Sequence, residues 1–327
     1  MITTKDIKWG SYDKYEGPVY HGKLGVSINN TSTFLEKCLY IISKTEGKIE
    51  SVNMYDAGIV SVGIMQYIER TNFGFSDLLG MIAERCGISY VNKHLGEALK
   101  LSNATFRQTE DGKRWRFYQI KNNDEIEVNN AALQREIFLS CTGERGKWTE
   151  ANKVHAKTWC AAIVNVLSCD DLAVEAQIDF CSERLFKYVF NNGKKYLYSL
   201  PDETGIKGAL KAIYVSYSIN LPKYAEEKLY LSFQHHTKPW SNEWVANFLK
   251  KFSTESGIKH WPNRYDNIVQ AVNECFNVKF PTSSFLLGKT TAVKSSSFIT
   301  THPYYEKYIF LFFFTLLSLF AFVYFLK

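Results

Sequence analysis

The stretch TEGKIESVNMYDAGIVSVGIMQ, residues 45–66, places carboxylates directly before an apolar segment that is interrupted by glycine. Upstream, residues 33–36 read Thr-Phe-Leu-Glu, the pattern of a helix N-terminal capping box, and apolar residues then recur at helical spacing. Gly47 is a typical residue for the end of such a helix. The sequence therefore predicts a helix that starts after Thr33, stops near Gly47 and carries Glu46 in its last turn.

Glu46 in that position has two reasons to favour its protonated form. The helix dipole disfavours a negative charge at a helix C-terminus, and desolvation at the edge of the apolar face disfavours it further. A carboxyl that keeps its proton near neutral pH is what general acid catalysis requires. Glu46 is therefore a candidate general acid, whereas Glu50 lies beyond the predicted helix end and is interpreted as solvated.

The segment that follows Glu46 has the composition of a short strand. Glycine within it indicates a bend or a close approach of the backbone to a ligand. Asp56 lies at the entry to this strand, and Ser61 and Gln66 lie along it. A small sheet that faces the helix would form one wall of a cleft. The strand-forming residues are Ile59, Val60, Val62, Ile64 and Tyr67, with Gly58 and Gly63 among them.

This arrangement resembles the active-site region of the lysozyme superfamily over about residues 33–75. Phage-type lysozymes carry a Glu at a helix end, followed by an Asp and then a Thr. In this sequence Asp56 is ten residues and Ser61 fifteen residues beyond Glu46, with Ser in place of Thr. Two further stretches are similar to other branches: Gly63-Ile64-Met65-Gln66 to the Gly-Leu-Met-Gln of lytic transglycosylases and goose-type lysozymes, and Ala57-Gly58-Ile59-Val60 to a strand of chitosanases.

The resemblance implies an α+β, mainly helical fold: a lysozyme-like domain with a small sheet beside the cleft. It implies cleavage of peptidoglycan or a related aminosugar polysaccharide, with Glu46 as general acid. In a muramidase Asp56 would position a water shared with Ser61. In a lytic transglycosylase the sugar's C6 hydroxyl attacks instead, and Asp56 is not catalytic. The residues expected to bind substrate are Tyr55, Gly63 and Gln66.

No cofactor or metal is implied. Two other readings stay open, which are a chitosanase-like hydrolase and a non-catalytic, tail-anchored protein that keeps the lysozyme-like fold for binding.

The C-terminal region predicts a membrane anchor. Residues 308–326 carry no charge, Pro or Gly, and as a helix they would span roughly 28 Å, close to the thickness of a bilayer core. The alternative is a buried core helix. The expected organisation is an N-terminal segment 1–31, a catalytic domain 32–285, a linker 286–307 and a single transmembrane helix. The weak excess of lysine before the helix predicts a body on the cytosolic side, where a wall-degrading enzyme would need release or delivery to reach its substrate.

The charge and the cysteine content restrict the partners and the cysteine chemistry that the sequence predicts. The net charge of +6 is mild and the basic residues do not cluster, so nucleic acid is not an expected partner. The seven cysteines include no CxxC pair, which favours reduced thiols. His235-His236 lacks a third ligand at a metal-like spacing and is interpreted as a pair of polar loop residues.

The remainder of the body predicts helices. One core helix is expected in residues 149–180, with Val154 and Trp159 on its apolar face, and others around residues 177–188, 208–215 and 242–252. Tryptophans can stack on sugar rings, although core packing is their commoner role. The candidates are Trp148, Trp159, Trp240, Trp244 and Trp261.

Overall fold

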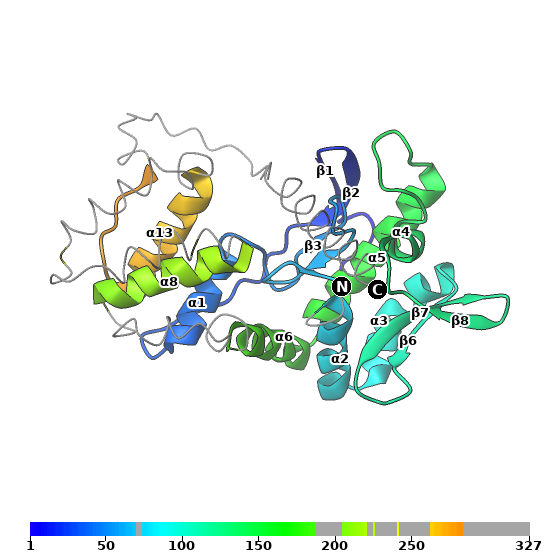
Figure 1. Ribbon diagram of the computed structural model, residues 1–327, viewed down its shortest axis with the longest axis horizontal. Coiled ribbons are helices and arrows are strands. Elements are labelled where there is room, and N and C mark those ends of the chain that lie inside the picture. The colour runs from blue at the N-terminus through cyan, green and yellow to red at the C-terminus, as the bar shows by residue number, and fades with distance from the viewer. Residues whose placement is uncertain (70–73, 187–204, 221–224, 226–240, 242–261, 284–327) are drawn as a thin grey trace, which may run out of the picture. The chain divides into compact units, whose positions relative to one another are not determined.

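Eight α-helices and two antiparallel sheets make up the part of the chain that the computed structural model describes, which is residues 1–69, 74–186, 205–220, 225, 241 and 262–283 (Figure 1). All of these residues fall within Met1–Thr291, the first of two units into which the chain divides. The described fold is therefore α+β, as the sequence predicts, but it contains two sheets where one small sheet is expected.

The first sheet has five strands in sequential order, and every neighbouring pair is antiparallel. Its strands are β1 (Lys8–Tyr12), β2 (Tyr15–Tyr20), β3 (Val52–Asn53), β4 (Ser61–Val62) and β5 (Tyr67–Ile68). β1 and β2 come from the N-terminal segment, and β2 pairs with β3. The segment before residue 32 thus contributes a hairpin to the same sheet as residues 52–68.

Helix α1 (Phe34–Ser43) begins as its sequence predicts. Thr33 is the N-cap, and its hydroxyl accepts a hydrogen bond from the Glu36 backbone N–H at 3.3 Å while the Glu36 carboxylate accepts from the Thr33 N–H at 2.6 Å. This capping box confirms the predicted helix start. The predicted end is wrong: α1 stops at Ser43 with Lys44 as C-cap, so Glu46 lies in the following loop and not in the last turn.

The single strand predicted after Glu46 is instead two short strands joined by a turn. β4 and β5 pair through Ser61↔Ile68 and Val62↔Tyr67, and residues 63–66 make the turn between them. Gly63 and Gln66 both have left-handed backbone conformations, with φ of 71° and 49°. Strand-forming side chains alone do not exclude a reversal of this kind, because the turn depends on these two backbone angles.

A second region of the fold consists of helices and a three-stranded sheet. It contains α2 (Phe75–Cys86), α3 (Ile88–Leu101), α4 (Ala131–Leu139), α5 (Glu150–Ser168) and α6 (Asp171–Arg184), and a sheet of β6 (Ala104–Gln108), β7 (Trp115–Lys121) and β8 (Asp124–Glu127). Aromatic rings from α2, β6, β7, α4 and α5 pack together at its centre. These are Phe75, Phe106, Phe117, Phe138 and Trp159.

The core helix predicted in residues 149–180 is interrupted. Cys169 ends α5, and Asp170 begins α6 by accepting a hydrogen bond from the Leu172 N–H at 2.8 Å. Trp159 is fully buried as expected, but Val154 is 61% exposed, so its assignment to the apolar face was wrong. Val154 lies in the first turns of α5 on the side that faces solvent, and the apolar periodicity is weak there.

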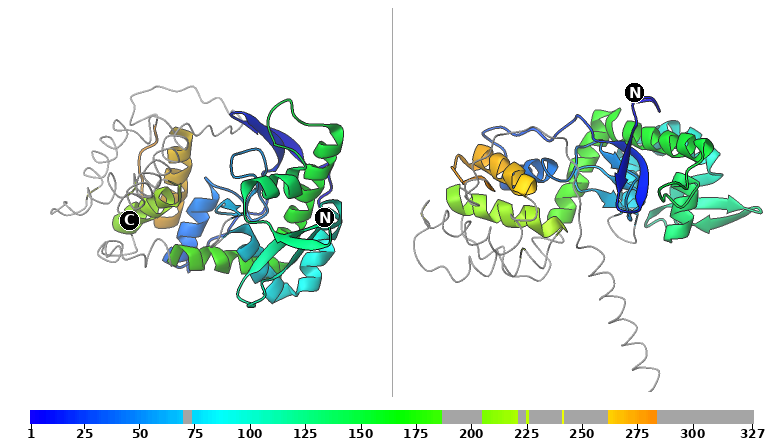
Figure 2. Two further views of the ribbon diagram at one scale, coloured as in Figure 1. Left: turned by 45° about the vertical axis from the view of Figure 1, so that its right-hand side comes forward. Right: turned by 90° about the horizontal axis from the view of Figure 1, so that it is seen from above.

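Helices α8 (Gly205–Asn220) and α13 (Pro262–Phe276) pack on each other and on α1, and they lie beside it in the views of Figures 1 and 2. The predicted helix at 208–215 is confirmed within α8. The helix expected at 242–252 lies outside the described residues, and the one expected at 177–188 is described only to residue 186, with α6 ending at Arg184.

The expected fold with a membrane-spanning helix is corrected by the structure. Among the helices of the described ranges, none has both the length and the apolar character that crossing a bilayer requires. The stretch 308–326 and the linker 286–307 lie outside the described residues. What the structure establishes is an α+β unit in which short strands follow α1 and a helical region surrounds α5.

Candidate functional site

Glu46 lies in the loop after α1, and Arg264 of α13 holds its side chain. The Glu46 N–H donates to the Ile42 carbonyl at 2.9 Å, so the chain leaves the helix in a tight turn. Arg264 Nη2 donates to Glu46 Oε1, and the two side chains are only 7% and 6% exposed. A buried pair of this kind holds both groups in place, and breaking it by removing one partner is costly.

The residue after Glu46 packs against the β4–β5 turn. A Cβ atom on Gly47 would come within 2.5 Å of Gln66 Nε2 and 2.6 Å of the Gly63 carbonyl oxygen, so only glycine fits there. The Gln66 side chain in turn donates from Nε2 to the Gly63 carbonyl at 3.0 Å. Gly63 and Gln66, both predicted to bind substrate, therefore form the support on which the Glu46 loop rests.

Gln177 of α6 approaches the same turn from the other side. Its Oε1 accepts a hydrogen bond from the Ile64 N–H at 3.3 Å, and a Cβ atom on Gly63 would overlap it. Gly63 is thus a glycine for two reasons, its positive φ and this contact. The close approach that the sequence predicts at Gly63 is made by a protein side chain.

Asp56 lies in the loop between β3 and β4, where three donors surround it. The Gly58 N–H donates to Oδ1 at 2.8 Å, and Asn53 Nδ2 and Ser61 Oγ donate to Oδ2 at 3.1 and 3.4 Å. Burial raises the pKa of Asp56, and the hydrogen bonds from Gly58 and Ser61 together with the charge of Arg135 work in the opposite direction. Asp56 and Ser61, expected from the resemblance to share a water, contact each other directly.

Tyr55 is half-buried between the first hairpin and the Asp56 loop. Its ring lies over Gly10 of β1, where a Cβ atom would come within 2.5 Å of the ring, and its backbone N–H donates to Asn53 Oδ1 at 3.0 Å. Burial and the nearby Asp56 charge raise the pKa of the Tyr55 hydroxyl. Tyr55 therefore stays neutral and packs beside Asp56.

Strand β4 connects the two groups. Ser61 contacts Asp56, and Gly63, two residues further, supports Gly47 and the Glu46 loop. Gly63 is the first residue of the turn after β4, so two residues of chain, at most roughly 7 Å, separate it from Ser61. The six predicted residues thus occupy one small region of the sheet, although Glu46 and Asp56 belong to separate hydrogen-bonded clusters.

Glu50, interpreted as solvated, is instead buried, with an exposed fraction of 5%. Its Oε1 accepts hydrogen bonds from the backbone N–H groups of Lys23 and Leu24 at 2.5 and 2.8 Å, and the carboxylate thereby fixes the segment that leads to α1. The interpretation was wrong because the chain after β2 folds back over residues 48–51. This contact joins residues 26 and 27 positions apart, which no local pattern reveals.

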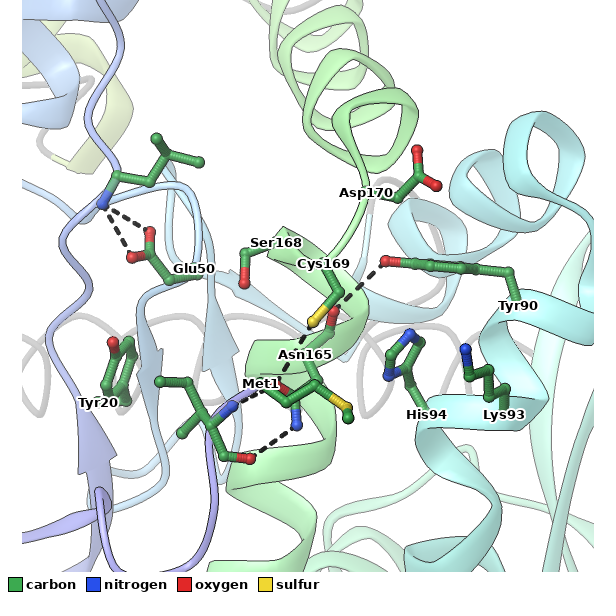
Figure 3. A pocket seen from close by; sticks show the side chains of 12 residues that line it. Met1, Tyr20, Glu50, Tyr90, Lys93, His94, Asn165, Ser168, Cys169 and Asp170 are labelled. Carbon is green, nitrogen blue, oxygen red and sulfur yellow. Dashed lines mark hydrogen bonds between the residues drawn. The ribbon is translucent and has the colours of Figure 1, made fainter.

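A pocket of about 620 Å³ opens beside Glu50 (Figure 3). Its wall on one side comes from β2 and the Glu50 loop and on the other from α3, and the C-terminal end of α5 lies between them. None of the six predicted site residues lines it. The lining residues are Met1, Ile2, Tyr20, Leu24, Glu50, Tyr90, Lys93, His94, Asn165, Ser168, Cys169 and Asp170.

Sequence reasoning missed Arg264, Asn53 and Gln177. Arg264 is 218 positions from Glu46, and nothing in the sequence links the two. Asn53, the last residue of β3, stands three positions before Asp56, and this proximity in the sequence was the one available signal. Gln177 lies within a helix whose polar residues are otherwise ordinary surface residues.

The other candidate residues are placed as follows. Trp159 is in the core, and Trp148 packs edge-on against Trp9 with ring centroids 4.8 Å apart. All seven cysteines are free thiols. Within the described residues no group of three or more His, Cys, Asp or Glu side chains is arranged to hold a metal ion. The remaining candidates, Trp240, Trp244, Trp261 and His235-His236, lie outside the described residues.

Comparison with known proteins gives no relative: no family model, curated protein or solved structure matches the chain.

Proposed function

We propose that the chain cleaves glycosidic bonds in an aminosugar polymer such as peptidoglycan, in the manner of a muramidase. The observation that carries the proposal is the relation of two carboxylates to β4: Asp56 is bonded to Ser61, where β4 starts, and Gly47, the neighbour of Glu46, packs against Gly63, which follows the end of β4. Retaining and inverting glycosidases both use such a pair of carboxyl groups.

The roles follow from what each group can do. Glu46 would give its proton to the leaving glycosidic oxygen as the bond to the anomeric carbon breaks. A water oriented by Asp56 and Ser61 would attack that carbon from the opposite face and pass a proton to Asp56. Asn53 and the Gly58 N–H would keep the Asp56 oxygens in place. The products would be ordinary reducing sugars, and no cofactor takes part.

Arg264 adds a requirement to this mechanism. The Arg264 guanidinium occupies Glu46 Oε1, whereas a general acid must present its carboxyl to the leaving oxygen. Substrate would therefore have to loosen the Glu46–Arg264 pair when it binds. In return, Arg264 orients Glu46 before substrate arrives and stabilises the carboxylate that remains after proton transfer.

The same ion pair supports a second candidate, a non-catalytic binding protein. With both side chains less than a tenth exposed, the pair has the features of a purely structural bridge. In that case the lysozyme-like arrangement would serve polymer recognition, and Glu46 would contribute to stability alone.

The test is zymography of the full-length chain on peptidoglycan and on chitosan, beside Glu46→Gln and a control, Glu84→Gln, which changes an exposed carboxylate of α2. We expect cleavage of peptidoglycan by the native chain and the control, and a loss of about 10² to 10⁴ in rate for Glu46→Gln. Cleavage of chitosan alone would assign the chitosanase-like chemistry. Binding without cleavage of either polymer would establish the non-catalytic alternative.

A further inference from the structure

The pocket beside Glu50 has a distribution of charge that the proposed cleavage reaction does not use. Lys93 and His94 stand on the α3 side, and Glu50 and Tyr20 stand on the other, with the end of α5 between them (Figure 3). A cationic residue, Lys93, and an anionic residue, Glu50, thus line the same cavity on opposite sides. Its volume of about 620 Å³ lies within the range of small-molecule sites.

The groups on the α3 side are available to a ligand. Among the described residues, Lys93 forms neither an ion pair nor a hydrogen bond, and the His94 ring only meets the ring of Tyr90 edge-on, with centroids 4.7 Å apart. The Tyr90 hydroxyl is already committed to the Val166 carbonyl at 3.0 Å. Burial and the nearby Lys93 lower the pKa of His94, so its imidazole is neutral at pH 7 and can donate one hydrogen bond. This wall suits a carboxylate.

The opposite wall is fixed in place. Glu50 lines the pocket, and the backbone N–H groups of Lys23 and Leu24 anchor its carboxylate with three hydrogen bonds, which leaves about one of its four acceptor positions. The Tyr20 hydroxyl beside it stays neutral, because burial and the Glu50 charge raise its pKa. This wall suits a cationic amino group.

The floor of the pocket is rigid. Asn165 of α5 holds the backbone of Ile2 with two hydrogen bonds, from the Ile2 N–H at 2.7 Å and to the Ile2 carbonyl at 2.9 Å. Asp170, at the rim, is occupied as the cap of α6. Since the two ends of the pocket have opposite charge, a polyanion such as a nucleotide would meet Glu50 and Asp170 unfavourably.

We propose that this pocket binds a small zwitterion, namely a free amino acid or short peptide, with its carboxylate at Lys93 and His94 and its amino group at Glu50. Glu50 is already held by backbone N–H groups before a ligand arrives, so this end of the pocket need not rearrange. Binding here is independent of the proposed cleavage reaction, because no residue assigned to that reaction lines the pocket.

The experiment is isothermal titration of the full-length chain with alanyl-alanine, in the L,L and D,D forms, and with two blocked versions, N-acetylated and C-amidated. Each blocked form removes one charge of the ligand, which tests the Glu50 end without altering Glu50, a residue the loop needs. We expect a Kd below about 1 mM for one unblocked isomer. We also expect at least tenfold weaker binding for each blocked form.

Lys93→Gln is the matched protein variant, and Lys100→Gln on the exposed end of the same helix is its control. Lys93→Gln should weaken binding at least tenfold, whereas Lys100→Gln should bind as the native chain does. Circular dichroism would show that each variant is folded. No binding of either dipeptide, equal binding of the blocked forms, undiminished binding by Lys93→Gln, or tighter binding of the neutral sugar di-N-acetylchitobiose would overturn the proposal.

Discussion

The Glu46 carboxylate is paired with the Arg264 guanidinium from a helix 218 residues further along the chain, and both side chains are less than a tenth exposed. The pair joins the loop after α1 to α13. Gly47, the residue after Glu46, packs against the turn that Gly63 and Gln66 form. The stability of this region and its proposed chemistry therefore depend on the same contact.

Arg264→Gln should lower the free energy of unfolding by about 3 to 5 kcal/mol, because it leaves the Glu46 charge buried without its partner. Urea denaturation of the full-length chain measures this. Arg85→Gln is the control, since it breaks an ion pair with Asp179 whose side chains are 38% and 53% exposed. Its effect should stay within about 1 kcal/mol.

The double variant Arg264→Gln with Glu46→Gln separates charge from packing. It removes both buried charges and should recover part of the stability lost by Arg264→Gln alone. If Arg264→Gln is no more destabilising than Arg85→Gln, the buried pair is not formed in solution.

Asp56→Asn tests the route of the proposed cleavage. An amide keeps the hydrogen bond with the Gly58 N–H but cannot take a proton from water, so turnover should fall by about 10² or more. Mass spectrometry of the products should show reducing sugars. Ser61→Ala removes one donor to Asp56 and should cost less. Anhydro sugars as products, with Asp56→Asn fully active, would show the transglycosylase route instead.

Gly63→Ala should destabilise the chain by about 2 to 4 kcal/mol, since an alanine is strained at positive φ and its methyl group would overlap Gln177. Adding Gln177→Ala should relieve the overlap but not the backbone strain. Gly96→Ala in α3 is the contrast, because nothing lies within 4 Å of its Cβ position. It should stabilise by about 0.5 to 1 kcal/mol. Thermal and urea unfolding measure all three, and equal effects at Gly63 and Gly96 would contradict the described turn.

Glu69 should make stability depend on pH. The pKa of Glu69 is raised from 4.5 to about 7. Burial is the main cause and the Asp77 charge adds to it, whereas two hydrogen bonds from Ser76 and the charge of Arg116 act in the opposite direction. The folded state therefore binds a proton more tightly than the unfolded state does. The associated stability is complete below about pH 4.5 and is lost as the pH rises through 7.

Glu69→Gln should remove this contribution, which is on the order of 1 to 3 kcal/mol between pH 4.5 and pH 8. Urea denaturation at a series of pH values measures the slope. Glu84→Gln, on the exposed face of α2, should leave the slope as it is in the native chain. A slope unchanged in Glu69→Gln would mean that this carboxyl is ionised throughout the range.

The sequence by itself determined the features that short-range hydrogen bonds control. The start of α1 follows from Thr33 and Glu36, which satisfy each other's backbone N–H groups within one turn. The proximity of Asp56 and Ser61 follows from a short loop that enters β4. The helix within 208–215 follows from apolar spacing, and the burial of Trp159 from its place on such a helix.

Only the tertiary structure decided the contacts that join distant segments. The break between α5 and α6 depends on Asp170 acting as a cap, and the reversal after Val62 depends on backbone angles at Gly63 and Gln66. The burial of Glu50 depends on the loop at Lys23 and Leu24, and the partner of Glu46 depends on α13, which packs on α1 and α8 because apolar helix faces must be covered. A local pattern specifies which side chains are polar, and the packing of the whole chain specifies which of them meet.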